Sequence, residues 1–222
     1  LIMSLAGNKG LANLGNTCYM NSAIQCLSHL LEFHPKNDDF IQRLNQSDEL
    51  YRSWYNTQIH LWSSLGEKVV VPTPFLKQFM SCCNEKDISF HNFNQNDTEE
   101  FINIFMNLLH ESVKVMADIS VEGTPKNQLE KLQVKSVNSW SDFFKDDYSY
   151  IIQKFYSQQL SITSCSKCDY YTVNFDPFMV LSLEIPEPDS NLYDCLSSYT
   201  NKTTLDADNL WTCDKCKQKV NP

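Results

Sequence analysis

The hydrophobic positions of residues 1–156 recur with the spacing of amphipathic helices. One helix is predicted to open at Thr73, as an N-cap followed by Pro74 at the first helical position. The clearest helix begins at Asp97, which has with Glu100 the spacing of a capping box. The apolar stripe that follows has the spacing of one helix face, and it consists of Phe101, Ile104, Phe105, Leu108 and Leu109.

The period of the pattern changes from 3.6 to 2 near residue 157. Residues 160–164 alternate between apolar and polar side chains, and so do residues 179–185, where Pro186 ends the run. Residues 118–136 are polar and contain a Gly-Thr-Pro sequence, so we predict a surface connection there. Helices therefore come first and strands second, which indicates an α+β fold rather than repeating βαβ units.

Composition and charge exclude several classes of protein. Of the 222 residues, 42% are hydrophobic, which is enough for a core, and the formal net charge is −9. An acidic chain is a poor nucleic-acid binder because phosphates require a basic face. No apolar run approaches the roughly 18 to 20 residues of a membrane span. The chain does not begin with Met or with a signal-peptide pattern, so we expect a domain of a larger protein in the cytoplasm, the nucleus or both.

The nine cysteines fall into distinct groups. Cys165 and Cys168 form one CxxC pair and Cys213 and Cys216 form a second, and two such pairs can converge on one tetrahedral Zn²⁺ with four thiolates. Such a site is structural rather than catalytic. Two disulfides or four free thiols are the alternatives, but the absence of a secretory signal favours zinc. The remaining cysteines other than Cys18 fit no motif and are interpreted as small buried residues.

Cys18 stands alone in a loop where a helical stripe starts. Unpaired backbone N–H groups and the helix dipole favour negative charge at that position, and the thiolate is the reactive form of cysteine. Gly15 allows a tight turn, and the side-chain amide of Asn13 can donate to a developing oxyanion. The alternative is a buried cysteine at a helix start, where Asn16 or Thr17 only caps the helix.

The sequence of residues 10–22, Gly-Leu-Ala-Asn-Leu-Gly-Asn-Thr-Cys-Tyr-Met-Asn-Ser, resembles the cysteine box of the ubiquitin-specific proteases. Members of that family cleave the isopeptide or peptide bond after the C-terminal glycine of ubiquitin. The resemblance implies that Cys18 is the nucleophile and that Asn13 is the oxyanion-hole side chain. It also implies that ubiquitin and ubiquitinated proteins are the partners, whereas no motif identifies adaptor subunits.

A second motif supports this resemblance. Residues 95–101, Gln-Asn-Asp-Thr-Glu-Glu-Phe, are similar to the family's second box, which lines the channel for the arginine-containing tail of ubiquitin. We therefore assign Gln95, Asp97 and Glu100 to substrate contact, although an acidic helix start that only satisfies the dipole explains the same residues. The resemblance implies a papain-like fold, with a helical thumb at residues 1–156 and β-rich zinc-ribbon fingers at residues 157–222.

A cysteine nucleophile of this kind needs a general base, usually a histidine. The chain has five histidines, and none has the Gly-His-Tyr context that the family uses: His29, His34, His60, His91 and His110. We expect the base and much of the palm to follow after Pro222. Two other classes remain open, namely a catalytically inactive ubiquitin-binding scaffold and a zinc-ribbon interaction protein in which the Cys18 loop is incidental.

Overall fold

The computed structural model describes residues 6–90, 95–204 and 210–220. The chain divides into two compact units. Unit 1 comprises residues 1–117 and 146–155, and unit 2 comprises residues 118–145 and 156–222. This division follows from the packing of the backbone, and it groups residues 118–145 with residues 156–222. The division into thumb and fingers at residues 156 and 157 stays a prediction.

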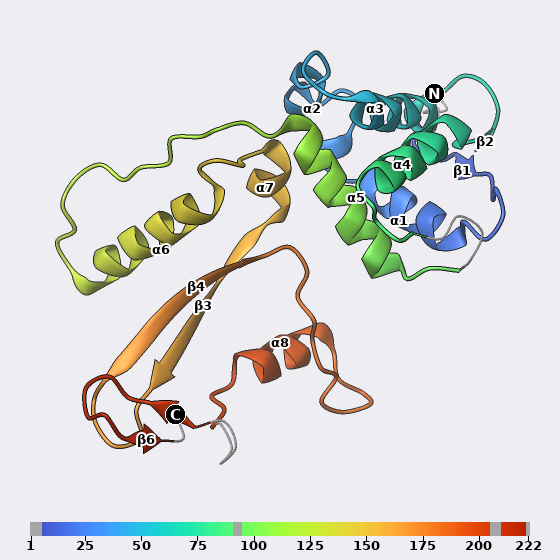
Figure 1. The fold of residues 1–222 in the computed structure, drawn as a ribbon. Coiled ribbons are helices and arrows are strands. Elements are labelled where there is room, and N and C mark those ends of the chain that lie inside the picture. Colours follow the sequence, from blue (N-terminus) through green and yellow to red (C-terminus); the bar gives the residue numbers. More distant parts are fainter. Residues whose placement is uncertain (1–5, 91–94, 205–209, 221–222) are drawn as a thin grey trace, which may run out of the picture. The chain divides into compact units, whose positions relative to one another are not determined.

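Unit 1 is mainly helical (Figure 1), and side-chain caps set several helix starts. Asp48 accepts a hydrogen bond from Tyr51 N at 3.0 Å, and Asp97 caps the predicted long helix. The helix predicted to have Thr73 as its N-cap begins one residue earlier than predicted. Thr73 is its first residue, and Pro72 is the N-cap. The elements of unit 1 are β1 (Gly10–Leu11), α1 (Cys18–Ser28), the 3-10 helix η1 (Leu31–Phe33), α2 (Asp38–Gln42), α3 (Glu49–Trp62), β2 (Val69–Val70), α4 (Thr73–Glu85), α5 (Thr98–Val113) and α7 (Tyr150–Phe155).

Aromatic side chains from α3, α4 and α5 form the centre of the unit 1 core. Phe105 is fully buried, and its ring lies 5.1 Å from that of Trp54 and 5.3 Å from that of Phe75, both in edge-to-face geometry. Phe101 stacks on Phe105 with ring centroids 5.6 Å apart. The stripe predicted after Asp97 is therefore the inner face of α5, with Ile104 at its half-buried edge.

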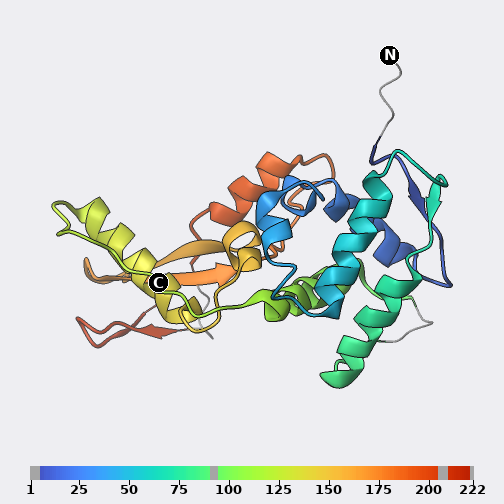
Figure 2. The same cartoon turned by 90° about the horizontal axis from the view of Figure 1, so that it is seen from above.

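Unit 2 is built around one antiparallel hairpin. Strands β3 (Ser157–Ser164) and β4 (Tyr171–Phe178) pair along their whole length and run side by side in both views (Figure 1 and Figure 2). Helix α6 (Gln128–Phe144) packs on β4, and Ser139 Oγ donates to Phe175 O at 3.1 Å. The other elements of unit 2 are α8 (Leu192–Thr200), β5 (Trp211–Thr212) and β6 (Lys219–Val220).

Two predicted segments differ from the structure. The surface connection predicted at residues 118–136 is wrong from residue 128 onward, because Asn127 caps α6 through Glu130 N at 2.9 Å. Most residues of α6 are polar, and none is buried. The strand predicted at residues 179–185 is not formed within the described part of the chain. Side chains 179–184 alternate between half-buried and exposed, but a strand also needs a hydrogen-bonded neighbour.

Among the residues whose positions are described, no helix has both the length and the apolar composition that a membrane crossing requires. The mixture of helices and strands agrees with the predicted α+β class.

Candidate active site and cysteine cluster

Cys18 is the first residue of α1, and its side chain is exposed. The buried face of this helix is formed by Met20, Ala23, Ile24 and Leu27. The alternative interpretation, a cysteine that only packs in the core, therefore does not agree with the structure. The assignment of Cys18 as nucleophile stays a prediction, and its accessibility is what that chemistry requires.

The loop before Cys18 depends on two successive residues with positive φ. Gly15 has φ 99° and Asn16 has φ 50°, a region that glycine and asparagine adopt more readily than other residues. These two residues reverse the chain between Asn13 and the helix start. A β-branched residue at either position would be strained, so the turn favours the sequence Gly-Asn.

The side-chain carbonyl of Asn13 holds this turn together. Asn13 Oδ1 accepts hydrogen bonds from Gly15 N at 3.1 Å, from Thr17 N at 3.1 Å and from Thr17 Oγ1 at 3.0 Å. Three donors at one atom identify it as the oxygen rather than the nitrogen of the amide. Among the described residues, the Nδ2 group of this exposed side chain makes no hydrogen bond.

The second motif lies beside the first turn of α1. Asn96 Nδ2 donates to Tyr19 Oη at 3.1 Å, and Tyr19 immediately follows Cys18. The Tyr19 ring contacts Phe90 at 5.9 Å and Phe101 at 6.0 Å between centroids. Burial raises the pKa of the Tyr19 phenol, although the bond from Asn96 opposes the shift, so the hydroxyl stays protonated at neutral pH. Sequence reasoning did not identify this link.

Asp97 is the N-cap of α5. Its Oδ1 atom accepts from Glu99 N at 2.7 Å and from Glu100 N at 3.1 Å. The predicted capping box is present only in this half, since the described residues show no bond from Glu100 back to the Asp97 backbone. Gln95, Asp97 and Glu100 are all exposed, so each is accessible to a ligand.

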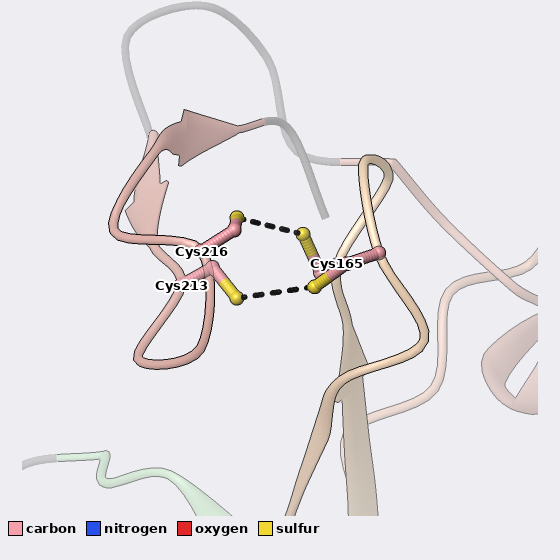
Figure 3. A group of neighbouring side chains, drawn as sticks. Cys165, Cys213 and Cys216 are labelled. Carbon is pink, nitrogen blue, oxygen red and sulfur yellow. Dashed lines mark hydrogen bonds between the residues drawn. The ribbon is translucent and has the colours of Figure 1, made fainter.

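The four cysteines of the two CxxC pairs come together in unit 2, as the spacing predicted. The Sγ atoms of Cys165 and Cys216 are 3.9 Å apart, those of Cys168 and Cys213 are 3.7 Å apart, and all four lie within 4.8 Å of one another. Figure 3 shows the side chains of Cys213 and Cys216 pointing from one loop toward Cys165 on the other. Four sulfurs around a tetrahedral Zn²⁺, each at about 2.3 Å from the metal, would be about 3.8 Å apart.

The two turns that carry these cysteines are similar. Cys165 N donates to Tyr170 O at 2.8 Å, and Cys213 N donates to Gln218 O at 3.0 Å. The rings of Tyr170 and Trp211 stack with an interplanar angle of 3°. Both turns are thus fixed by backbone hydrogen bonds, and a stacked pair of rings packs against the buried thiols.

The four neighbouring thiols also shift one another's pKa values. Burial raises the pKa of the Cys213 thiol. The hydrogen bonds from the backbone N–H groups of Cys216 and Lys215 outweigh this effect, and the pKa falls to about 7. The backbone N–H of Tyr170 lowers the pKa of Cys168, but burial and the three neighbouring thiols raise it to about 12. Thiolates at this separation repel one another, and a cation placed between them would offset that repulsion.

None of the histidines with described positions is bonded to Cys18. His29 and His34 both pack against Trp62, His60 is exposed in the last turn of α3, and His110 is buried. His110 Nδ1 bonds Ser149 Oγ at 2.8 Å, and burial lowers its pKa. His91 lies outside the described residues.

Unit 2 also contains a groove of about 750 Å³ between β3 and α8. Its described lining includes Leu160, Ile162, Leu196 and Tyr199, but no cysteine, histidine, aspartate or glutamate. The described lining of this groove therefore offers no thiol, imidazole or carboxylate.

Comparison with known proteins identifies the family. The family model described as ubiquitin carboxyl-terminal hydrolase matches residues 9–219, so the chain belongs to that family. This match confirms the resemblance to the ubiquitin-specific proteases.

Individual relatives agree with the family model. Ubiquitin carboxyl-terminal hydrolase 2 of Bos taurus is 32% identical over 233 residues, which cover 97% of this chain and 36% of the relative. Ubiquitin carboxyl-terminal hydrolase 4 of Saccharomyces cerevisiae (strain YJM789) is 27% identical over 230 residues, which cover 95% of this chain and 25% of the relative. The chain thus spans between a quarter and somewhat over a third of these proteins.

A solved structure has the same fold. One chain of the SAGA DUB module of Ubp8, Sgf11, Sus1 and Sgf73 bound to monoubiquitin superposes with a TM-score of 0.67 at 20% sequence identity. The similarity covers 100% of the present chain and 45% of that chain. At this identity the likeness establishes the fold and not the activity.

Proposed function

We propose that this chain carries the nucleophile of a thiol-dependent deubiquitinase, which hydrolyses the isopeptide or peptide bond after the C-terminal glycine of ubiquitin. The observation that carries the proposal is the exposed Cys18 at the start of α1, in a loop where Asn13 keeps its Nδ2 group available. The family membership of the chain gives this geometry its substrate class.

The reaction divides between groups of this chain and a general base. The sulfur of Cys18 attacks the carbonyl carbon of the terminal glycine, and Asn13 Nδ2 donates to the oxyanion that forms. The amine leaves with a proton and a thioester remains on Cys18. Water then hydrolyses the thioester, which releases the carboxylate and restores the thiol. The base is proposed to be a histidine other than the four described ones, because none of these is bonded to Cys18.

We assign the exposed segment at the start of α5 to the tail of the substrate. Asp97 uses Oδ1 for the helix cap, so its other carboxylate oxygen is available for a charge-assisted hydrogen bond to an arginine. Gln95 and Glu100 are exposed beside it and are proposed as further contacts. The hydrogen bond between Asn96 and Tyr19 supports this assignment, because it links the segment to the residue after the nucleophile.

We also propose that Cys165, Cys168, Cys213 and Cys216 hold a structural Zn²⁺. The separations of their sulfur atoms support this metal, since they match those of a tetrahedral four-thiolate site. When bound, the ion would neutralise the thiolates and tie the two turns together. We interpret residues 157–222 accordingly as the fingers of a papain-like protease, which contact the body of ubiquitin.

The experiment that tests the catalytic proposal uses a ubiquitin C-terminal electrophile on the full-length protein. Labelling at Cys18 is expected by peptide mass spectrometry, and the Cys18→Ser variant is expected to lose both labelling and hydrolysis of a fluorogenic ubiquitin substrate. Cys26→Ser is the matched control, because Cys26 is also an exposed cysteine of α1. Ubiquitin binding without any labelling would support the inactive scaffold instead.

Metal analysis of the full-length protein tests the zinc proposal. One equivalent of zinc is expected in addition to any metal held elsewhere, and Cys213→Ser is expected to release that equivalent. Cys195→Ser is the control, because Cys195 is buried in α8 and is not part of the cluster. Equal zinc content in wild type and Cys213→Ser would overturn the assignment.

Intracellular imaging of the full-length protein tests its proposed place in the cytoplasm, the nucleus or both.

A further inference from the structure

The segment that leads into Asn13 is held on two sides. Toward β2 it donates two backbone hydrogen bonds, from Gly10 N to Lys68 O and from Ala12 N to Val70 O, each at 2.9 Å. Toward α1 its carbonyl groups accept two side-chain hydrogen bonds. Asn21 Nδ2 donates to Ala12 O at 3.1 Å, and Gln25 Nε2 donates to Lys9 O at 2.8 Å. The segment is therefore fixed directly to the helix that begins with Cys18.

The spacing of these two donors is significant. Asn21 and Gln25 are four residues apart, so they lie on one face of α1 and project toward the same neighbour. Both are only partly exposed, and within the described part of the chain the side-chain N–H groups of each donate only to this segment. An amide N–H group matches a carbonyl oxygen, and a carboxylate of the same shape would repel it.

Asn13 itself has little freedom to correct an error in the position of its backbone. Its Oδ1 atom is already bonded to the amides of Gly15 and Thr17 and to the Thr17 hydroxyl. The direction of its Nδ2 group is thus set by the backbone from residue 12 to the start of α1. The bond from Asn21 is made to Ala12, the residue immediately before Asn13.

We propose that Asn21 and Gln25 are positioning residues, which fix the distance between the oxyanion donor Asn13 and the nucleophile Cys18. This role rests on the proposed function. The two side chains connect the loop that carries one reacting group to the helix that carries the other. Displacing a catalytic group by about 1 Å can reduce the rate by about 100-fold, so the pair acts on turnover rather than on ubiquitin binding.

The test compares variants of the full-length protein in hydrolysis of a fluorogenic ubiquitin substrate. Gln25→Glu keeps the side-chain size and replaces the donor by an acceptor, and Asn21→Ala removes the other donor. For each we expect kcat to fall about 10- to 100-fold with KM changed by less than about 3-fold. The rate of Cys18 alkylation by iodoacetamide is expected to change by less than about 3-fold, because alkylation uses no oxyanion donor.

A double-mutant cycle with Asn13→Ala separates positioning from a general loss of structure. If Asn21 and Gln25 act through Asn13, adding either variant to Asn13→Ala is expected to cost less than about 2-fold in kcat. Thr57→Ala is the control for stability, since it removes the hydrogen bond of the buried residue Thr57 to Ser53 O in α3 and is expected to leave kcat unchanged. If Asn21→Ala fails to fold, Gln25→Glu decides the outcome.

The outcomes distinguish this inference from the proposed function. Wild-type kcat in Gln25→Glu, or an equal loss of kcat with and without Asn13, would overturn the positioning role while the enzyme remained active. A wild-type protein that neither hydrolyses the substrate nor labels at Cys18 would refute the proposed function and this role with it.

Discussion

Replacing Asp97 by asparagine separates two roles of one carboxylate. In the structure Asp97 Oδ1 accepts from Glu99 N and Glu100 N, and an asparagine oxygen caps a helix about as well as an aspartate oxygen. The cap is therefore expected to persist in Asp97→Asn. The variant loses only the negative charge at the positive end of α5, which costs about 0.3 to 1 kcal/mol of stability.

The same substitution removes the charge that we assign to the substrate. A hydrogen bond to a charged group contributes about 1.5 to 3 kcal/mol, and the exposure of Asp97 places it near the lower end of that range. A loss of about 1 to 2 kcal/mol corresponds to a decrease of about 5- to 30-fold in kcat/KM. Because the contact lies away from the scissile bond, we expect the decrease to appear mainly in KM.

Asp48→Asn provides the matched control. Asp48 is also an aspartate N-cap in unit 1, and it accepts from Tyr51 N at the start of α3. Both variants are expected to lower the midpoint of thermal unfolding by a similar small amount, while only Asp97→Asn raises KM for the fluorogenic ubiquitin substrate. A KM for Asp97→Asn within 2-fold of wild type, or an equal rise in Asp48→Asn, would refute the reasoning.

Two further predictions concern stability. Phe105→Ala is expected to lower the free energy of unfolding by about 3 to 5 kcal/mol in chemical denaturation, whereas Phe143→Ala, at a position 56% exposed, is expected to cost far less. Burial lowers the pKa of His110, so the unfolded chain binds a proton first and stability falls as pH drops below about 6.5. The difference in free energy of unfolding between wild type and His110→Gln is therefore expected to narrow as the pH falls from about 7.5 to about 5.5. An unchanged difference would contradict this prediction.

The sequence predicted those elements whose signals are local. The apolar stripe after Asp97 forms the inner face of α5. It was predictable because the N-cap and the five-residue apolar pattern both indicate a helix that begins at this point. The prediction failed at residues 128–136, where α6 packs on β4 without burying any residue and its polar residues resemble those of a surface loop. It failed again at residues 179–185, because period-two alternation does not report whether a partner strand is present.

The candidate site was predictable to a similar extent. The convergence of Cys165, Cys168, Cys213 and Cys216 followed from spacing alone, since each CxxC turn brings two sulfurs to one point. The hydrogen bonds from side-chain amides to distant backbone carbonyls were not predictable, because they depend on how α1 lies against the N-terminal strand. Asparagine and glutamine in a helix carry no period or motif that would reveal such contacts.

The chain passes between the two units three times, near residues 117, 145 and 155, and this path limits how such a protein can be shortened or rearranged. A gene truncated at residue 117 would omit α7, whose Tyr150, Ile151 and Ile152 are nearly fully buried. Insertions within residues 118–127 should be far better tolerated. Val115 and Tyr148 exchange backbone hydrogen bonds of 2.7 and 2.9 Å at the base of this excursion, and the cost of closing a longer excursion there rises only slowly with its length.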